Sequence, residues 1–299
     1  MPSLPAVANL LAFEAVARRR SFAFAATELH LTASAISHQI ARLEADLGVR
    51  LFERSAHGVR LSPAGERYLE RVSGALSAIS SATEDVRKGV GNSLYVHSAP
   101  SIASLWLMPR LRGFAQAHPD IALNLSAAHT PSDFALGQAD LDIRYGVPQW
   151  GDLVVEPLFT ERVVPLASPA FIREHRLKRI EQLFDVPLIQ SNVSVVQWSD
   201  WLSEFADKRS PDRFALHFDR AQMSLDAATQ GLGVALESAV NAGPHLSAGR
   251  LKAVFGLDKA IRVKAHFVVY PAKHAKRPPV EAFLSWVHGE AARTEAGFR

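Results

Sequence analysis

The stretch from Ser21 to Leu47, SFAFAATELHLTASAISHQIARLEADL, constrains the fold more than any other part of the chain. Its second half repeats apolar residues at the spacing of one face of an α-helix. These residues are Ile36, Ile40, Leu43 and Leu47. The pattern predicts an amphipathic helix, joined by a tight turn to a shorter helix over Ser21–Leu29. Such a pair fits an ordinary helical hairpin as well as a DNA-binding helix–turn–helix.

The face opposite this stripe has the small and polar side chains that a DNA groove admits. The major groove is about 12 Å wide, so an entering helix needs short side chains that reach base edges. Thr32 is placed to cap the helix, which leaves a partly positive N-terminus suited to phosphate. We expect base contacts from Thr32, Ser34, Ser37 and His38. Arg42 is expected to contact phosphate, or alternatively to pair with Asp46 one turn later.

A wing and a long helix are predicted to follow. After Gly48, a predicted C-cap, short strands are expected at Arg50–Glu53 and Val59–Leu61 around a turn. Ser62 and Pro63 then open a helix that continues to about Lys88. Its apolar positions are spaced by three and four residues, as in a heptad repeat. They are Leu69, Val72, Leu76, Ile79, Thr83 and Val86. We interpret this seam as a contact with a second copy, with packing on its own domain as the alternative.

The segment from Leu10 to Arg54 resembles the winged helix–turn–helix of LysR-type transcriptional regulators. Matching strings include Ser21-Phe22, Ala25-Ala26, Ser34-Ala35 and Leu51-Phe52-Glu53-Arg54. The resemblance implies promoter DNA as a partner, with the wing residue Arg54 against the DNA backbone or minor groove. It also implies a homodimer or homotetramer joined through the long helix, and contact with RNA polymerase is possible for such a regulator.

Beyond the glycine-rich stretch Gly89–Ser93, short strands alternate with helices, which indicates an α/β region with mainly parallel sheets. One helix is expected over Ser101–Ala117. The strings WLMPRL (Trp106–Leu111) and DLDIRYG (Asp140–Gly146) resemble the two-lobed LysR effector-binding domain, which is similar to periplasmic solute-binding proteins. The similarity points to the glycine-cleavage-activator-like subgroup, which includes β-lactamase activator-like regulators.

The predicted architecture is therefore α+β and multidomain. Residues 1–62 are expected to form the winged helix–turn–helix and 63–90 the linker and dimerisation helix. Residues 91–299 are expected to form the two-lobed α/β effector-binding domain. We place lobe I at about 91–167 and 263–299, and lobe II at about 168–262.

A ligand of such a domain is expected in the crevice at the carboxyl ends of the strands. Hydroxyl groups, one guanidinium and histidines are placed there, which suits an amino acid, a small carboxylate or a muropeptide. The candidate residues are Ser98, Ser101, Ser104, His129, Thr130, Arg144, Tyr145, Gln190, Ser191, Ser224 and His266. Trp198 and Trp201 are expected in the core.

Other classes of protein fit the sequence less well. The chain has no cysteine, so it has neither disulfides nor thiolate sites, and its histidines lack metal-ligand spacing. We find no nucleophile elbow, P-loop or dinucleotide-binding glycine pattern, so we expect neither an enzyme nor a cofactor. No signal peptide is visible and no apolar run approaches the ~20 residues of a membrane span, which predicts a soluble, cytoplasmic protein. The alternatives are a cytoplasmic solute-binding sensor or an enzyme on the same two-lobed fold.

Overall fold

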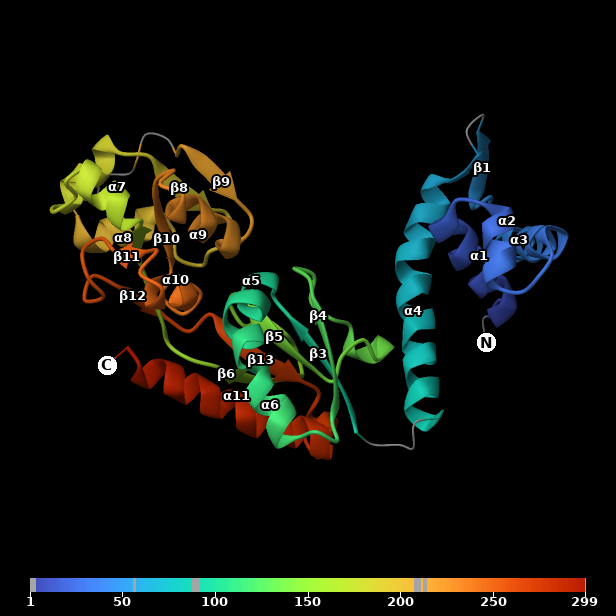
Figure 1. Cartoon of the computed structure of the whole chain (residues 1–299). Helices are drawn as coiled ribbons and strands as arrows, with labels where there is room; N and C mark the ends of the chain where they lie inside the picture. Colours follow the sequence, from blue (N-terminus) through green and yellow to red (C-terminus); the bar gives the residue numbers. More distant parts are fainter. Residues whose placement is uncertain (1–3, 56–57, 88–91, 207–210, 212–213, 299) are drawn as a thin grey trace. The chain divides into compact units, whose positions relative to one another are not determined.

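The computed structural model describes residues 4–55, 58–87, 92–206, 211 and 214–298. Contacts divide the chain into two compact units, Met1–Val90 with Ala135–Gln138, and Gly91–Phe134 with Ala139–Arg299 (Figure 1). Each unit is described by itself. Within the described ranges, none of the helices combines the length and hydrophobicity that a membrane span requires.

The N-terminal unit contains the predicted helix–turn–helix and wing. Its first elements are α1 (Val7–Arg19), α2 (Phe22–Glu28), α3 (Ala33–Leu47), β1 (Phe52–Ser55) and β2 (Gly58–Leu61). Ser21 caps α2 by accepting a hydrogen bond from the Phe24 amide, and Gly48 ends α3 in the left-handed conformation, with φ of 67°. Only glycine adopts that conformation without strain from a Cβ. Phe13 and Val16 of α1 pack in one core with Ile36 and Leu43 of α3, as the apolar stripe predicted.

The wing is a two-stranded antiparallel sheet in which Phe52 pairs with Leu61 and Arg54 with Val59. Its first strand starts two residues later than predicted, and both strands extend into the expected turn. Residues 56 and 57, at the tip, lie outside the described part of the chain.

The long helix α4 (Pro63–Arg87) begins against the wing. The Ser62 hydroxyl accepts from the Gly65 amide at 3.0 Å and donates to the Arg50 carbonyl oxygen at 2.7 Å. At Gly65 a Cβ would lie 2.1 Å from the Leu51 carbonyl oxygen, so only glycine allows this close approach.

The predicted seam of α4 is incompletely covered. Leu69, Val72 and Leu76 are half-buried, and Ile79 and Thr83 are exposed. The side chain of Val86 and the glycine-rich stretch 89–91 lie outside the described residues.

Lobe I of the second unit is built on a five-stranded sheet of order β4-β3-β5-β13-β6. The strands are β3 (Ser93–Ser98), β4 (Ala122–Ala127), β5 (Leu141–Tyr145), β6 (Val154–Pro157) and β13 (His266–Tyr270). The helices α6 (Leu111–Ala117) and α11 (Pro278–Ala296) lie next to each other, with the rings of Phe114 and Phe283 5.3 Å apart (Figure 1). Short 3-10 turns lie at Phe134–Leu136 and Ala272–His274.

The helix predicted over Ser101–Ala117 is continuous but is not one regular α-helix. The chain instead forms α5 (Pro100–Ile102), a π-helical turn at Ala103–Leu107, a 3-10 turn at Met108–Arg110, and α6. Pro109 lacks an amide proton, and its ring would clash with the carbonyl group four residues earlier in a regular helix. The π-helical and 3-10 turns absorb this break.

Lobe II is built on a six-stranded sheet of order β11-β7-β10-β8-β9, with β12 also paired to β7. The strands are β7 (Glu161–Ala167), β8 (Leu188–Ser191), β9 (Leu216–Phe218), β10 (Val234–Ser238), β11 (Lys252–Ala253) and β12 (Ile261–Val263). The helices are α7 (Pro169–Glu174), a 3-10 turn at Ile180–Asp185, α8 (Trp198–Phe205), α9 (Ala221–Thr229) and α10 (Gly243–Ser247). Trp198 and Trp201 are buried in the core of this lobe, as predicted.

Two predictions about this unit need correction. The first segment of lobe I was predicted to continue to about residue 167, but β7 pairs antiparallel with β10, β11 and β12 of lobe II. The chain therefore crosses to lobe II between β6 and β7 and returns between β12 and β13. The sheets are also mixed rather than mainly parallel, because β13 runs antiparallel to both β5 and β6.

Candidate DNA interface and effector cavity

Helix α3 presents a polar face to solvent. Thr32 accepts a hydrogen bond from the Ala35 amide at 3.2 Å and so caps the helix, as predicted. The candidate side chains on this helix are all exposed: Thr32, Ser34, Ser37, His38 and Arg42. Because Ile36, Ile40 and Leu43 are buried on the opposite face, the orientation of these polar groups is fixed by the core.

Glu44 joins α3 to the wing, a role that the sequence did not reveal. Its Oε1 accepts hydrogen bonds from the amides of Leu51 at 2.7 Å and Phe52 at 3.2 Å. A carboxylate that accepts two amides makes stronger hydrogen bonds than a neutral acceptor. The first wing strand therefore starts at a fixed position relative to α3.

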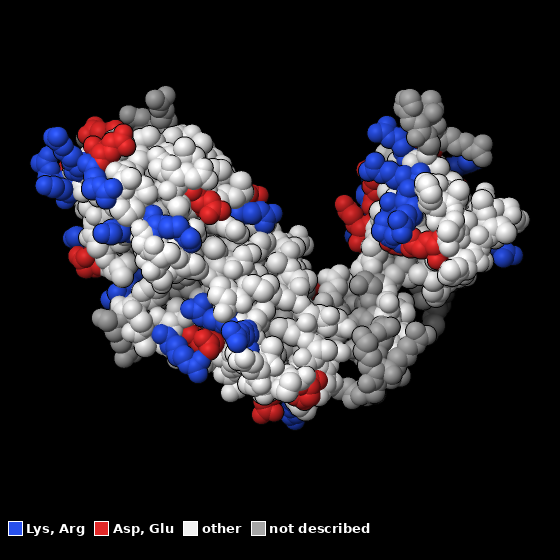
Figure 2. Space-filling view, in the orientation of Figure 1, with Lys and Arg blue, Asp and Glu red and all other residues white. Residues whose placement is uncertain are grey.

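The arginines of this unit fall into two groups. Arg18 pairs with Glu14 and Glu28, and Arg19 pairs with Glu28, so these two cations are already neutralised. Arg42 forms no ion pair with Asp46 among the described residues, which leaves its guanidinium open to solvent. Figure 2 shows basic side chains grouped on the visible face of the N-terminal unit, with acidic ones beside them. The backbone of Arg54 lies in β1, and its side chain lies outside the described part.

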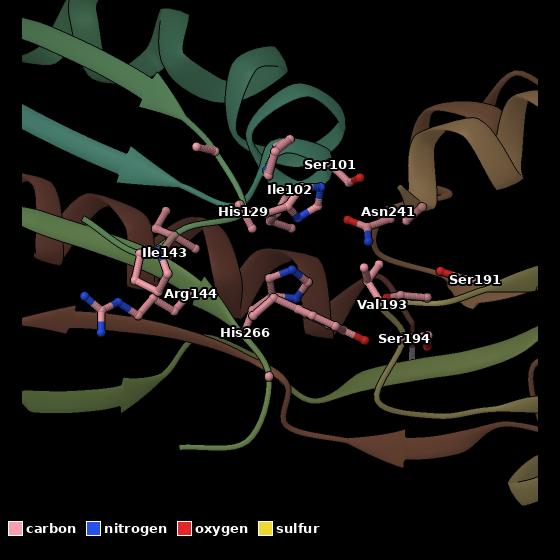
Figure 3. Close-up of a pocket in the computed structure, with 18 of the residues that line it drawn as sticks. Ser101, Ile102, His129, Ile143, Arg144, Ser191, Val193, Ser194, Asn241 and His266 are labelled. Carbon is pink, nitrogen blue, oxygen red and sulfur yellow. The ribbon is translucent and has the colours of Figure 1, made fainter. Parts of the chain in front are cut away.

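A cavity of about 390 Å³ lies between the two lobes of the second unit (Figure 3). Six of the predicted residues line it: Ser101, His129, Arg144, Tyr145, Ser191 and His266. Five predicted residues are not among its lining residues: Ser98, Ser104, Thr130, Gln190 and Ser224.

Each of these five residues has another environment. Ser98 is fully buried and donates to the Ala99 carbonyl oxygen at 3.2 Å, and Ser104 is exposed on the π-helical turn. Thr130 offers only its carbonyl oxygen, which lies 3.1 Å from His97 Nε2. None of these three residues is among those that line the cavity.

The amide of Gln190 donates to the Ser191 carbonyl oxygen and to Gln197. Ser224 is buried on α9, behind the cavity wall and next to Glu237.

Arg144 lines the cavity, and its guanidinium is already paired within lobe I. Its Nε donates to Asp142 Oδ2 at 2.9 Å and its Nη2 to the Ser132 carbonyl oxygen at 3.1 Å. The guanidinium also lies 5.6 Å from the ring centre of Trp150. Figure 3 shows it pointing away from the other labelled residues. Arg144 therefore stabilises lobe I, and its charge is balanced by the buried Asp142.

A buried pair joins the lobes beside the cavity, which His266 lines. His266 Nδ1, at the start of β13, lies 2.9 Å from Glu161 Oε1, at the start of β7. The ring of Tyr145 lies 4.7 Å from that of His266, and its hydroxyl accepts from the Val195 amide of lobe II at 3.0 Å. Burial, with the nearby charge of Glu161, raises the pKa of Tyr145 above its usual value, so the phenol stays protonated.

A second contact between the lobes lies at Ser101. Its hydroxyl accepts a hydrogen bond from the Gln222 amide at 3.3 Å, at the start of α9. Together with the Tyr145–Val195 bond, this contact links the two cavity walls through groups that a ligand or a lobe movement can displace.

Lobe II contributes cavity residues that the sequence analysis missed. Glu237 and Asn241 line the cavity, and both are buried. Burial raises the pKa of Glu237 to about 8, and the charge of Glu161 acts in the same direction, while Ser224 and Ser191 oppose the shift. The run Val234–Ser238, VALES, contained a signal for Glu237. Burying an acid inside an apolar strand is costly, so its presence there indicates a specific local role.

Metal chemistry finds no support in this arrangement. Among the described residues, no group of three or more histidine or acidic side chains is placed to hold a metal ion.

Both units of the chain match known protein families. Residues 7–66 match the bacterial regulatory helix-turn-helix proteins of the lysR family, and residues 87–292 match the LysR substrate binding domain. The chain is 39% identical over 95% of its length, and 95% of the relative's, to the uncharacterized HTH-type transcriptional regulator y4mQ of Sinorhizobium fredii. It is 33% identical to the glycine cleavage system transcriptional activator of Escherichia coli over 99% of its own length and 97% of the relative's.

A solved structure supports the same assignment for the second unit. The effector domain of the transcriptional regulator AmpR of Pseudomonas aeruginosa is similar with a TM-score of 0.60 and 25% identity. The similarity covers 69% of this chain and 98% of that one. The winged helix–turn–helix, the two-lobed domain and these matches together show that the chain belongs to the LysR family of transcriptional regulators.

Proposed function

We propose that this regulator reads promoter DNA with the exposed face of α3 and responds to a small polar molecule in the cavity between its lobes. The observation that carries the first part is the exposure of Ser34, Ser37 and His38 opposite the buried residues of the apolar stripe, which are Ile36, Ile40 and Leu43. Thr32 and these three residues contact base edges, while Arg42 and Arg54 contact phosphates.

The domain limits stay as first proposed for the N-terminal part: 1–62 for DNA binding and 63–90 for the linker helix. Residues 91–299 bind the effector. The boundary between the lobes is moved to the two crossings, which lie between β6 and β7 and between β12 and β13. We further propose that the chain has no catalytic activity and acts in the cytoplasm. The regulators to which it is similar support the first of these statements.

The cavity residues fit a small polar effector. Ser101, His129 and Tyr145 belong to lobe I, and Ser191 belongs to lobe II, so a ligand held between them contacts both lobes. A ligand that binds one arrangement of the lobes better shifts the population towards that arrangement. By linkage, the same ligand changes DNA affinity if the two arrangements of the oligomer differ in their fit to the operator.

The test of DNA reading starts with the fragment upstream of the protein's own gene, in excess random competitor and at roughly physiological salt. We expect retained binding, with protection of two sites related by helical turns. The variant Ser37→Ala should lose specific binding while most binding to random DNA remains, because a base contact is removed. In contrast, Arg42→Ala and Arg54→Ala should weaken both kinds of binding and lower the salt dependence. Equal losses on operator and random DNA for Ser37→Ala would contradict the base-reading role.

A further inference from the structure

The lobe II wall of the cavity holds buried polar atoms that lack partners. Within the described residues, Ser191 Oγ, Glu237 Oε1 and Asn241 Oδ1 form no hydrogen bond and are closed to solvent. The three residues are 5%, 3% and 4% exposed, and all of them line the cavity. A buried polar atom without a hydrogen bond is costly, so three on one wall indicate a missing partner.

The chemistry of these atoms defines that partner. A carboxylate oxygen and an amide oxygen only accept hydrogen bonds, and a serine hydroxyl accepts as well as donates. A partner for this wall must therefore supply several N–H or O–H donors. A primary ammonium has three donors and a positive charge.

The other wall does not offer an uncompensated cation for an anionic ligand. Arg144, a lining arginine on β5, is already bound to Asp142 and to the Ser132 carbonyl oxygen. His266 is paired with Glu161. Asp142 is paired with Arg144, so among the described lining residues Glu237 is the acid without a cationic partner, and its ionised form favours a cation.

We propose that the effector carries a primary ammonium group, which donates hydrogen bonds to Glu237, Asn241 and Ser191 on the lobe II wall. This inference rests on the proposed effector role of the cavity and narrows its ligand class to amines and amino acids. The rest of the ligand extends towards Ser101 and His129 of lobe I (Figure 3).

Binding of the ammonium is coupled to loss of a proton. Near neutral pH the Glu237 carboxyl is mostly protonated, because its pKa is about 8. When the ammonium arrives, the O–H bond of the carboxyl breaks and the proton leaves to the buffer, while the ammonium keeps its own three protons. The groups around this carboxyl are Glu161 of β7, Tyr145 of β5, Ser191 of β8 and Ser224 of α9. Glu161 is in turn paired with His266 of β13, and it is the nearby acid that raises the pKa of Glu237.

The experiment measures binding of methylammonium to the full-length protein, by calorimetry and by thermal shift. Affinity should rise with pH and level off above about 8, because only the ionised carboxylate is competent. At pH 6 it should be about 100-fold weaker than at the plateau, since about one molecule in a hundred is then competent. Tetramethylammonium, which has the charge but no N–H donors, should bind at least about tenfold more weakly. Acetate tests the opposite case, in which protonated Glu237 donates to an anion.

Two variants separate the proposed contacts from a general effect of charge. Glu237→Gln should abolish the pH dependence and weaken binding at high pH, and Asn241→Leu should weaken binding without changing the pH dependence. The matched control Glu181→Gln removes an exposed acid of the same lobe and should behave as the wild type. Tryptophan fluorescence verifies that each variant is folded.

Three outcomes would overturn the inference: no methylammonium binding at any pH, equal binding of tetramethylammonium, or acetate binding that strengthens as pH falls. Operator binding of the same samples tests the proposed function separately. Amine binding without operator binding would refute DNA reading alone. Operator binding that responds to acetate and not to methylammonium would refute the ligand class alone.

Discussion

The buried carboxyl of Glu237 makes the unliganded protein less stable at high pH, and Glu237→Gln should remove that loss. The pKa is raised from 4.5 to about 8 on folding. When the pKa of an acid is higher in the folded state than in the unfolded state, that acid costs no stability at pH values below its unfolded pKa. Its cost grows as pH rises from about 4.5 to about 8 and then stays constant. Since one pKa unit corresponds to about 1.4 kcal/mol, the full cost is about 5 kcal/mol.

Glutamine keeps the size and hydrogen-bonding shape of the acid but does not ionise. The variant should therefore resemble the wild type at about pH 5 and be more stable by about 5 kcal/mol at about pH 9. At a urea dependence of about 3 kcal/mol per molar, this is a midpoint shift of about 1.7 M. Such a shift is a large part of the stability of a typical domain.

Tryptophan fluorescence gives a clean assay, because all five tryptophans lie in the effector-binding unit. They are Trp106, Trp150, Trp198, Trp201 and Trp286. Urea unfolding followed by this signal at the two pH values reports that unit alone. Glu181→Gln should shift neither midpoint by more than about 0.5 kcal/mol. If Glu237→Gln changes stability equally at both pH values, the carboxyl is ionised in the fold and the reasoning fails.

Three further predictions concern the N-terminal unit. Gly65→Ala should destabilise the N-terminal unit by about 1–3 kcal/mol, because the new Cβ meets the Leu51 carbonyl oxygen. The thermal unfolding transition seen by helical circular dichroism should then move to lower temperature, while the transition seen by tryptophan fluorescence stays unchanged. Glu44→Ala should lower the free energy of unfolding by about 1.5–3 kcal/mol and weaken operator binding, since two amides lose a charged acceptor. Glu44→Gln should lose less stability, and equal losses of stability would show that the charge of Glu44 is irrelevant. Leu76→Asp should break the dimer in light scattering, because a charge in a heptad seam opposes pairing, and an unchanged dimer would show that the seam packs elsewhere.

Local signals in the sequence predicted local structure well. The Thr32 cap, the Gly48 stop and the stripe of α3 each depend on residues within a few positions, so their outcome follows from backbone geometry and periodicity. The runs Leu141–Tyr145 and His266–Tyr270 likewise predict strands, and β5 and β13 have these limits. The break at Pro109 also had a local cause and was missed because the apolar pattern continues through it.

The pairing of strands that lie far apart in the sequence was harder to predict. Whether Glu161–Ala167 joins lobe I or lobe II is decided by its antiparallel partner β10, about seventy residues later. Likewise, an arginine at a strand end can face a ligand or a neighbour. Arg144 pairs with Asp142 two residues away, and the sequence allowed both outcomes. Glu237 lies inside the buried strand β10, whereas the predicted ligand residues were placed at strand ends.

The two crossings between the lobes have a consequence for how specificity can be exchanged. Lobe II is one uninterrupted stretch, and its ends are neighbours, since Glu161 pairs with Val263 across β7 and β12. It has the topology of an insertion into lobe I, and insertions with adjacent ends are readily tolerated by a host domain. A graft of residues 161–263 from a relative would therefore transplant one whole cavity wall, including its Glu237 position, while leaving the operator-reading helix and the remaining wall in place.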